Sequence, residues 1–137
     1  MGRLEPTHSI RADLDASVIA FSIGGYWTTG AMKTFLGDLG TAATPLLKRR
    51  EPFSALGDLT DFVPQDRATA AAIRDSLLAA QKNGLRRFAV VNPAPLVKMQ
   101  YRRIAEGVEV AFFESMTEAK NWLREAGANR AAAPTGS

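Results

Sequence analysis

The segment Leu85-Arg86-Arg87-Phe88-Ala89-Val90-Val91-Asn92 has four consecutive apolar residues at its centre. A strand with one solvated face alternates apolar and polar side chains, whereas a strand buried on both faces reads as a continuous apolar run. The run 88–91 therefore predicts the central strand of a sheet whose two faces are both covered.

Four other segments repeat apolar residues at three- and four-residue intervals, which is the spacing of one face of a helix. Each begins with a capping side chain or with a proline suited to the first turn. These predicted helices start after Thr28 or Thr29, at Asp66, after Pro93 or Pro95, and at Ser115. Their predicted buried stripes are Met32, Phe35, Leu36 and Leu39; Ile73, Leu77 and Ala80; Val97, Tyr101 and Ile104; and Ala119, Trp122, Leu123 and Ala126.

Local signals also mark the helix ends. Gly84 and Gly107 follow two of the predicted helices, and glycine readily takes the left-handed conformation that ends a helix. Ser115-Met116-Thr117-Glu118 has the form of a capping box, in which the serine and glutamate satisfy each other's backbone donors. By contrast, Thr44-Pro45 breaks the helical pattern, so we expect residues 40–52 to form an irregular connection unless Leu46 and Leu47 prolong the helix.

Three further stretches have the character of strands. Residues 8–27 alternate apolar and polar positions on either side of Asp15-Ala16-Ser17, which predicts a hairpin. Residues 53–62 and 108–114 are short apolar segments between predicted helices. The first strand leaves an open edge that can pair with a second copy, and its residues favour neither a monomer nor a homodimer.

Strands and helices therefore follow the order ββαβαβαβα. This order is typical of an α/β fold in which right-handed crossovers place the strands in one mainly parallel sheet. The N-terminal hairpin makes the sheet mixed, so we expect a single layer of sheet with about four helices. A length of 137 residues suits one domain, predicted over 8–126, with a disordered N-terminus at 1–7 and a disordered tail at 127–137.

Composition excludes several kinds of chemistry. The chain has no cysteine and one histidine, His8, which rules out thiolate catalysis, zinc fingers, iron–sulfur clusters and disulfides. No second histidine is present to act as a base, and His8 lies near the N-terminus, so a Ser-His-Asp triad is not expected. We expect no cofactor and no enzymatic activity.

The charges also limit the choice of partner. Seventeen lysines and arginines stand against fourteen acidic residues, a net charge of +3, but the cations are scattered along the chain. A scattered excess does not form the basic stripe typical of nucleic-acid binding. No apolar run approaches the ~20 residues of a membrane helix, and the N-terminus lacks the apolar middle of a signal peptide. We therefore expect a cytoplasmic protein that does not bind nucleic acid and has no membrane span.

The segment 58–66 collects three carboxylates, Asp58, Asp61 and Asp66, between a strand and a helix. Ligands and partners of parallel sheets usually bind at the carboxyl ends of the strands. Three carboxylates can hold magnesium, but a structural cap at Asp66 is the favoured interpretation, because phosphoryl transfer would also require a lysine and a phosphate-binding loop. The glycine-rich residues 24–30 do not match such a loop and are interpreted as a turn followed by a helix cap.

Two smaller groups of side chains can also bind something. Trp27, Phe35, Tyr101 and Phe112 are predicted to border an apolar pocket between sheet and helices. Lys98 and Arg102 lie one helical turn apart and form a small basic patch, which a carboxylate or phosphate can contact but which is more often a solvated helix face.

The motif Asp58-Leu59-Thr60, followed by Phe62, Val63 and Asp66 at the start of an apolar helix, resembles the signature of STAS domains. These are the modules of bacterial anti-sigma-factor antagonists and sulfate-transporter tails, and their pattern runs Asp-Leu-Ser, Phe-Met-Asp, then Ser-Ser-Gly or Ser-Thr-Gly. Within that group the chain is most similar to SpoIIAA-like bacterial proteins, whose closing helix carries a Trp-Leu pair, here Trp122-Leu123. The resemblance implies a STAS-type α/β fold and a regulatory role without catalysis.

One position departs from the family pattern. Where classical antagonists carry a phosphorylated serine at the helix start, this chain has Ala68, which has no hydroxyl. Thr69 is the neighbouring hydroxyl, but one residue along a helix turns a side chain by about 100°. A switch that adds phosphate charge at the docking surface is therefore not expected here.

Three functions remain open, in order of preference. The first is a regulatory module that binds another protein through the surface formed by Asp58, Thr60, Asp61, Asp66, Arg67, Ala68 and Thr69. The second is a binding protein for a small apolar or amphipathic molecule in the predicted pocket. The third is an enzyme with a divalent metal at the three aspartates.

Overall fold

The computed structural model describes residues 4–125, so Ala126 and the predicted tail 127–137 lie outside this range. Of the predicted disordered N-terminus 1–7, residues 4–7 are described, and Thr7 begins the first strand. The observed elements are β1 (Thr7–Asp13), β2 (Val18–Gly24), α1 (Thr29–Lys48), β3 (Phe53–Asp58), α2 (Arg67–Lys82), β4 (Leu85–Val91), α3 (Pro95–Ile104) and β5 (Val110–Phe113). A further helix covers 116–125 and is called the C-terminal helix below. The predicted order of strands and helices is confirmed.

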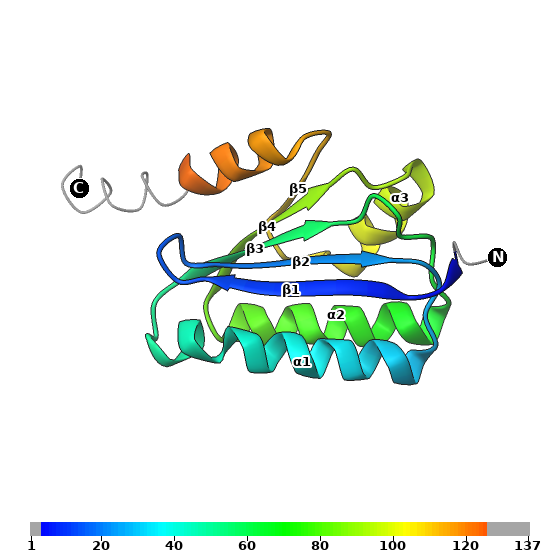
Figure 1. Ribbon diagram of the computed structural model, residues 1–137, viewed down its shortest axis with the longest axis horizontal. Coiled ribbons are helices and arrows are strands. Elements are labelled where there is room, and N and C mark those ends of the chain that lie inside the picture. Colours follow the sequence, from blue (N-terminus) through cyan, green and yellow to red (C-terminus); the bar gives the residue numbers. More distant parts are fainter. Residues whose placement is uncertain (1–3, 126–137) are drawn as a thin grey trace.

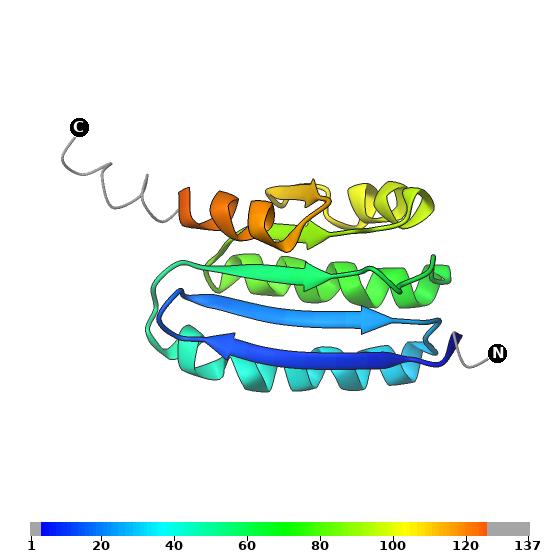
Figure 2. The same cartoon turned by 45° about the horizontal axis from the view of Figure 1, so that its top comes forward.

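The five strands form one sheet in the order β1-β2-β3-β4-β5. β1 and β2 pair antiparallel, and the other neighbours pair parallel, which confirms the mainly parallel mixed sheet with an N-terminal hairpin. Helices α1 and α2 lie along one face of the sheet, and the C-terminal helix lies on the other (Figure 1). Figure 2 shows the same arrangement with the C-terminal helix brought to the front of the sheet.

The predicted central strand is buried from both sides. Phe88 and Val90 of β4 belong to the larger hydrophobic cluster, which also contains the buried faces of α1, α2 and α3. Ala89 and Val91 point the other way, into a smaller cluster with Leu123 of the C-terminal helix. The continuous apolar run in β4 is therefore a consequence of helices packing against both faces of the sheet.

The prediction of an irregular connection over 40–52 is wrong, and its stated alternative, that Leu46 and Leu47 prolong the helix, is confirmed. Helix α1 continues through Pro45 to Lys48, and only residues 49–52 connect it to β3. A proline inside a helix costs about 3 kcal/mol, because it removes a backbone donor and crowds the preceding turn. Ala43 and Leu46 on either side of Pro45 are buried in the core, and a buried leucine side chain contributes about 1.5–3 kcal/mol. Core packing therefore offsets the local penalty.

Side chains cap the helices at the predicted positions, although in the predicted capping box the Glu118 carboxylate contacts the Ser115 hydroxyl and not a backbone donor. The Thr28 hydroxyl accepts a hydrogen bond from the Ala31 backbone N–H at 3.1 Å, and Pro95 occupies the first turn of α3. At the C-terminal helix, Ser115 Oγ accepts from the Glu118 N–H at 3.1 Å, and the same hydroxyl lies 3.2 Å from the glutamate carboxylate. None of the helices within residues 4–125 combines the length and the apolar character needed to cross a membrane.

Candidate functional site

The acidic bend after β3 is exposed but firmly anchored. Leu59 and Phe62 are buried in the core, whereas Thr60 and Asp61 between them are exposed. Asp58 Oδ1 accepts hydrogen bonds from the Thr60 backbone N–H at 3.0 Å and from the Thr60 hydroxyl at 2.6 Å, which closes a tight turn. The bend therefore presents polar side chains to solvent from a fixed backbone, at the carboxyl end of a parallel strand.

A buried glutamine that was not singled out in the sequence holds this bend in place. Gln65 Oε1 accepts from the Trp27 backbone N–H at 2.8 Å, and its Nε2 donates to the carbonyls of Gly25 at 3.0 Å and Val63 at 2.6 Å. The side chain of Gln100 in α3 bonds both backbone groups of Gln65, at 2.9 and 2.8 Å. The loops after β2 and β3 and the helix α3 are thus joined at one residue.

Asp66 is a helix cap, as predicted. Its Oδ1 accepts from the Thr69 backbone N–H at 2.8 Å, and its Oδ2 lies 3.5 Å from the Tyr26 hydroxyl. Hydrogen bonds from the backbone and then the side chain of Thr69 hold the pKa of Asp66 below its ordinary value. Asp58 and Asp66 are therefore occupied by the turn and the cap, and residues 4–125 contain no group of three side chains placed to hold a metal ion.

Thr69 is predicted to belong to the exposed partner-binding surface, but it does not. Its side chain is fully buried, and its hydroxyl lies 3.1 Å from the hydroxyl of Thr29 in α1. Arg67 and Ala68 are exposed at the start of α2, as expected. The difference arises because the buried stripe of α2 begins at Thr69 and continues through Ile73 and Leu77.

Large apolar side chains are exposed on two segments that hydrogen bonds join to the bend, the loop after β2 and helix α3. Leu4 accepts a backbone hydrogen bond from Tyr26 at the end of β2, and the two side chains are 56% and 44% exposed. Leu96 and Met99 of α3 are 65% and 54% exposed, and Met99 is next to the Gln100 that bonds the bend. The parallel strands β2–β4 all end at this side of the sheet (Figure 1).

We call this surface the edge platform. It consists of the polar residues Asp58, Thr60, Asp61, Asp66, Arg67 and Ala68 and the apolar residues Leu4, Tyr26, Leu96 and Met99. The exposure of Leu96 and Met99 in α3 could have been predicted from the sequence. These two residues are three positions apart and lie outside the predicted buried stripe of that helix. Gln65 has no such signal, because all its partners except Val63 are 35 to 40 residues away.

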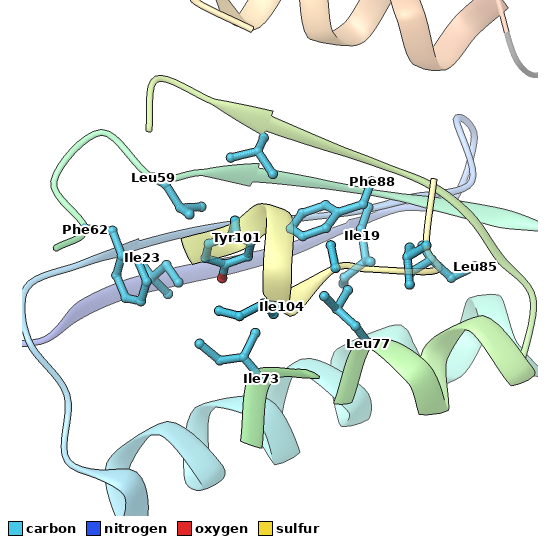
Figure 3. Close-up of a cluster of buried hydrophobic side chains, with 14 of the residues drawn as sticks. Ile19, Ile23, Leu59, Phe62, Ile73, Leu77, Leu85, Phe88, Tyr101 and Ile104 are labelled. Carbon is cyan, nitrogen blue, oxygen red and sulfur yellow. The ribbon is translucent and has the colours of Figure 1, made fainter. Parts of the chain in front are cut away.

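A cavity of about 230 Å³ lies between helices α1 and α2 and the sheet. Phe35 and Tyr101 line it, as the predicted pocket requires, but Trp27 and Phe112 are not among its lining residues. Trp27 packs on Phe35 at a ring distance of 5.5 Å and donates its indole N–H to the Gly24 carbonyl, so its ring is part of the core at the end of β2. Figure 3 shows the buried side chains around Tyr101.

Phe112 belongs instead to the predicted basic patch. The Lys98 ammonium and the Arg102 guanidinium lie 5.5 and 5.8 Å from the centre of its ring. Both distances suit cation–π contacts. The patch is therefore a real cluster of two cations from α3 over one aromatic ring of β5, and these internal contacts account for its geometry.

The fold and the edge platform define a small mixed α/β protein with a surface at its strand ends. The chain matches no protein-family model and no curated protein. Among solved structures it is similar to an uncharacterized protein of the DUF3478 family with a SpoIIAA-like fold from Shewanella loihica, at 22% identity and a TM-score of 0.63. The match covers 86% of this chain and 93% of that one, so the fold is SpoIIAA-like, as the resemblance to STAS domains implied.

Proposed function

We propose that this chain is a non-catalytic, SpoIIAA-like regulatory module that binds a partner protein on the edge platform. The observation that carries the proposal is the distribution of exposed apolar side chains. Five large apolar residues are exposed among the described residues, and four of them belong to the platform; the fifth, Leu14, is in the turn between β1 and β2. A concentration of this kind is typical of an interaction surface.

The charges of the platform indicate the chemistry of its partner. Asp58, Asp61 and Asp66 outnumber the single cation Arg67, and Asp61 is exposed. A partner with apolar side chains surrounded by lysine or arginine matches this surface. Complementary charges increase the association rate and the specificity, while burial of the apolar side chains supplies affinity.

The rigidity of the platform supports the same function. The Gln65 hydrogen bonds and the buried Leu59 and Phe62 fix the bend before any partner arrives. A surface that is already ordered loses less conformational entropy on binding than a mobile loop does. Other hydrogen bonds engage the carboxylates of Asp58 and Asp66 in a turn and a helix cap, which supports a docking function over catalysis.

The absence of a hydroxyl at Ala68 supports binding that phosphorylation does not control. The nearby hydroxyl of Thr69 is buried and paired with that of Thr29, so a kinase would have to open the start of α2 to reach it.

Site-specific photo-crosslinking tests the proposal. A photoreactive amino acid at Met99 is expected to capture a protein in cells of the source organism, and the same amino acid at Leu14 is the matched control on the far side of the molecule. The captured protein is then purified and titrated with the wild-type chain, Asp61→Arg and Leu14→Glu. We expect Asp61→Arg to weaken binding at least tenfold and Leu14→Glu to leave it unchanged. Equal capture from both positions, or equal affinity of all three chains, would refute the proposal.

A further inference from the structure

The cavity between α1, α2 and the sheet is large for a folded interior. Native cores contain few voids larger than a water molecule. An apolar cavity of about 150 Å³ is sufficient to bind benzene, and this cavity has about 230 Å³. By the same ratio it suits a molecule of about nine non-hydrogen atoms. Its floor includes Phe21 and Phe88, and its walls include Leu36, Leu39 and Leu77.

Tyr101 contributes a buried hydroxyl to this space. Its ring packs edge-on against Phe62 and Phe88, at 6.3 and 6.1 Å, and Figure 3 shows the oxygen directed toward Ile73 and Ile104 on the helical side of the sheet. Tyr101 is 2% exposed and lines the cavity, and no hydrogen bond joins its hydroxyl to another residue of 4–125. Every side-chain oxygen of these residues that is completely enclosed has a hydrogen-bond partner. The Tyr101 hydroxyl has none, so it is not completely enclosed, and we infer that it borders the cavity that Tyr101 lines.

The remaining lining defines what the cavity can accept. None of its lining residues carries a charge. The other two polar side chains are those of Ser76, in the C-terminal half of α2, and Asn83, the residue that follows α2. An ionised group would lose its hydration there without gaining a counter-ion. Burial also raises the pKa of Tyr101, so its hydroxyl stays protonated and can donate one hydrogen bond.

Small residues of both helices line part of the cavity. Gly40 of α1 and Ala79 and Ala80 of α2 are among its lining residues, and Gly40 and Ala79 are exposed to solvent. A methyl group added at Gly40 would touch nothing within 4 Å, so there is open space at this position.

We propose that this cavity binds a neutral apolar molecule of about nine non-hydrogen atoms with one acceptor oxygen, such as a medium-chain ketone or aldehyde, which accepts a hydrogen bond from the Tyr101 hydroxyl. The site is separate from the edge platform, and the proposal does not depend on protein binding there.

The test uses 2-nonanone, nonane and nonanoate as probes of nearly equal size, titrated into the full chain by isothermal calorimetry. We expect wild type to bind 2-nonanone most tightly, and Tyr101→Phe to weaken 2-nonanone on the order of tenfold while leaving nonane unchanged. Ala43→Met, which fills the cavity, is expected to weaken both neutral probes.

Two results would overturn the proposal: no binding of 2-nonanone to wild type, or equal binding of 2-nonanone to wild type and Tyr101→Phe. Tighter binding of nonanoate than of 2-nonanone would also contradict it, because an anion would then be preferred. A further measurement uses wild type alone, so it does not depend on whether the variants fold. The ¹³C resonance of the bound ketone carbonyl must lie downfield of its position in an alkane solvent, where the oxygen accepts no hydrogen bond, and a resonance at the alkane position would disprove the bond to Tyr101.

Discussion

Replacing Gln65 by alanine should loosen the edge platform and destabilise the whole chain. The side chain makes three hydrogen bonds to buried or half-buried backbone groups of two different loops. A typical hydrogen bond contributes about 1 kcal/mol net, so their loss amounts to about 3 kcal/mol. For a chain of this length that corresponds to a fall in Tm of about 10 °C. Urea unfolding followed by circular dichroism measures the free energy, and Gln65→Ala within about 1 kcal/mol of wild type would refute the reasoning.

Two further variants separate hydrogen bonding from packing. Gln81→Ala is the matched control, because Gln81 is exposed and donates a single bond to the Gly107 carbonyl; it should cost less than about 1 kcal/mol. Gln65→Glu keeps the shape of the side chain but turns a carboxylate toward two carbonyl oxygens, so it should destabilise the fold at neutral pH. Burial disfavours the ionised form, so this variant should regain stability as the pH falls. No recovery at low pH would contradict this account of the Gln65 bonds.

Three other variants test local features of the fold. The folded-state pKa of Asp66 is lowered, so its stabilising effect is present above the unfolded-state pKa of 3.8 and is lost as the pH falls through the folded-state pKa. Urea titrations at several pH values should therefore show that the difference in unfolding free energy between wild type and Asp66→Asn shrinks as the pH falls. A difference that stays constant with pH would contradict the role of the Asp66 carboxylate as a cap. Gly57→Ala should lower the free energy of unfolding by about 1–3 kcal/mol, because its methyl group would lie 2.6 Å from the Phe21 ring. Gly37→Ala, at an open helical position, is the control and should raise the free energy of unfolding by about 0.5–1 kcal/mol. Equal effects of the two variants would refute the steric argument. Pro45→Ala restores a backbone donor inside α1, but it also makes the unfolded chain more flexible, which offsets part of the gain. The free energy of unfolding should therefore rise by about 1–2 kcal/mol. A lower free energy of unfolding would contradict the local penalty that we assign to Pro45.

Local signals predicted most of the fold because they act over a few residues. The apolar run of β4 and the cap at Asp66 depend on neighbours within one strand or one turn, and both are confirmed. The length of α1 could not be obtained in this way. Pro45 is locally unfavourable, and the burial of Leu46 that outweighs it depends on the sheet beneath.

The candidate site was predictable in its backbone but not in its contacts. An exposed bend between the buried Leu59 and Phe62 follows from the alternation of apolar and polar residues. The burial of Thr69 depends on which face of α2 meets α1. Phe112 was placed in the wrong group for a similar reason, because the cations that cover it come from α3. Such contacts join distant parts of the chain and leave no periodicity in the sequence.

The platform and the cavity share helices α2 and α3 but depend on different faces and ends of them: on α3, Leu96 and Met99 are exposed at the platform, whereas Tyr101 is buried at the cavity. Helix α2 begins at the platform with the Asp66 cap, and its stripe through Ile73 and Leu77 lines the cavity. Asp61→Arg changes an exposed charge outside the cavity lining, whereas Tyr101→Phe removes a buried hydroxyl without altering the exposed surface. Each variant therefore tests one proposal and serves as a control for the other. If Tyr101→Phe also abolished capture of the partner, the two sites would have to be coupled, most directly through α3, which carries both Tyr101 and the platform residues Leu96 and Met99, and their description as independent would be wrong.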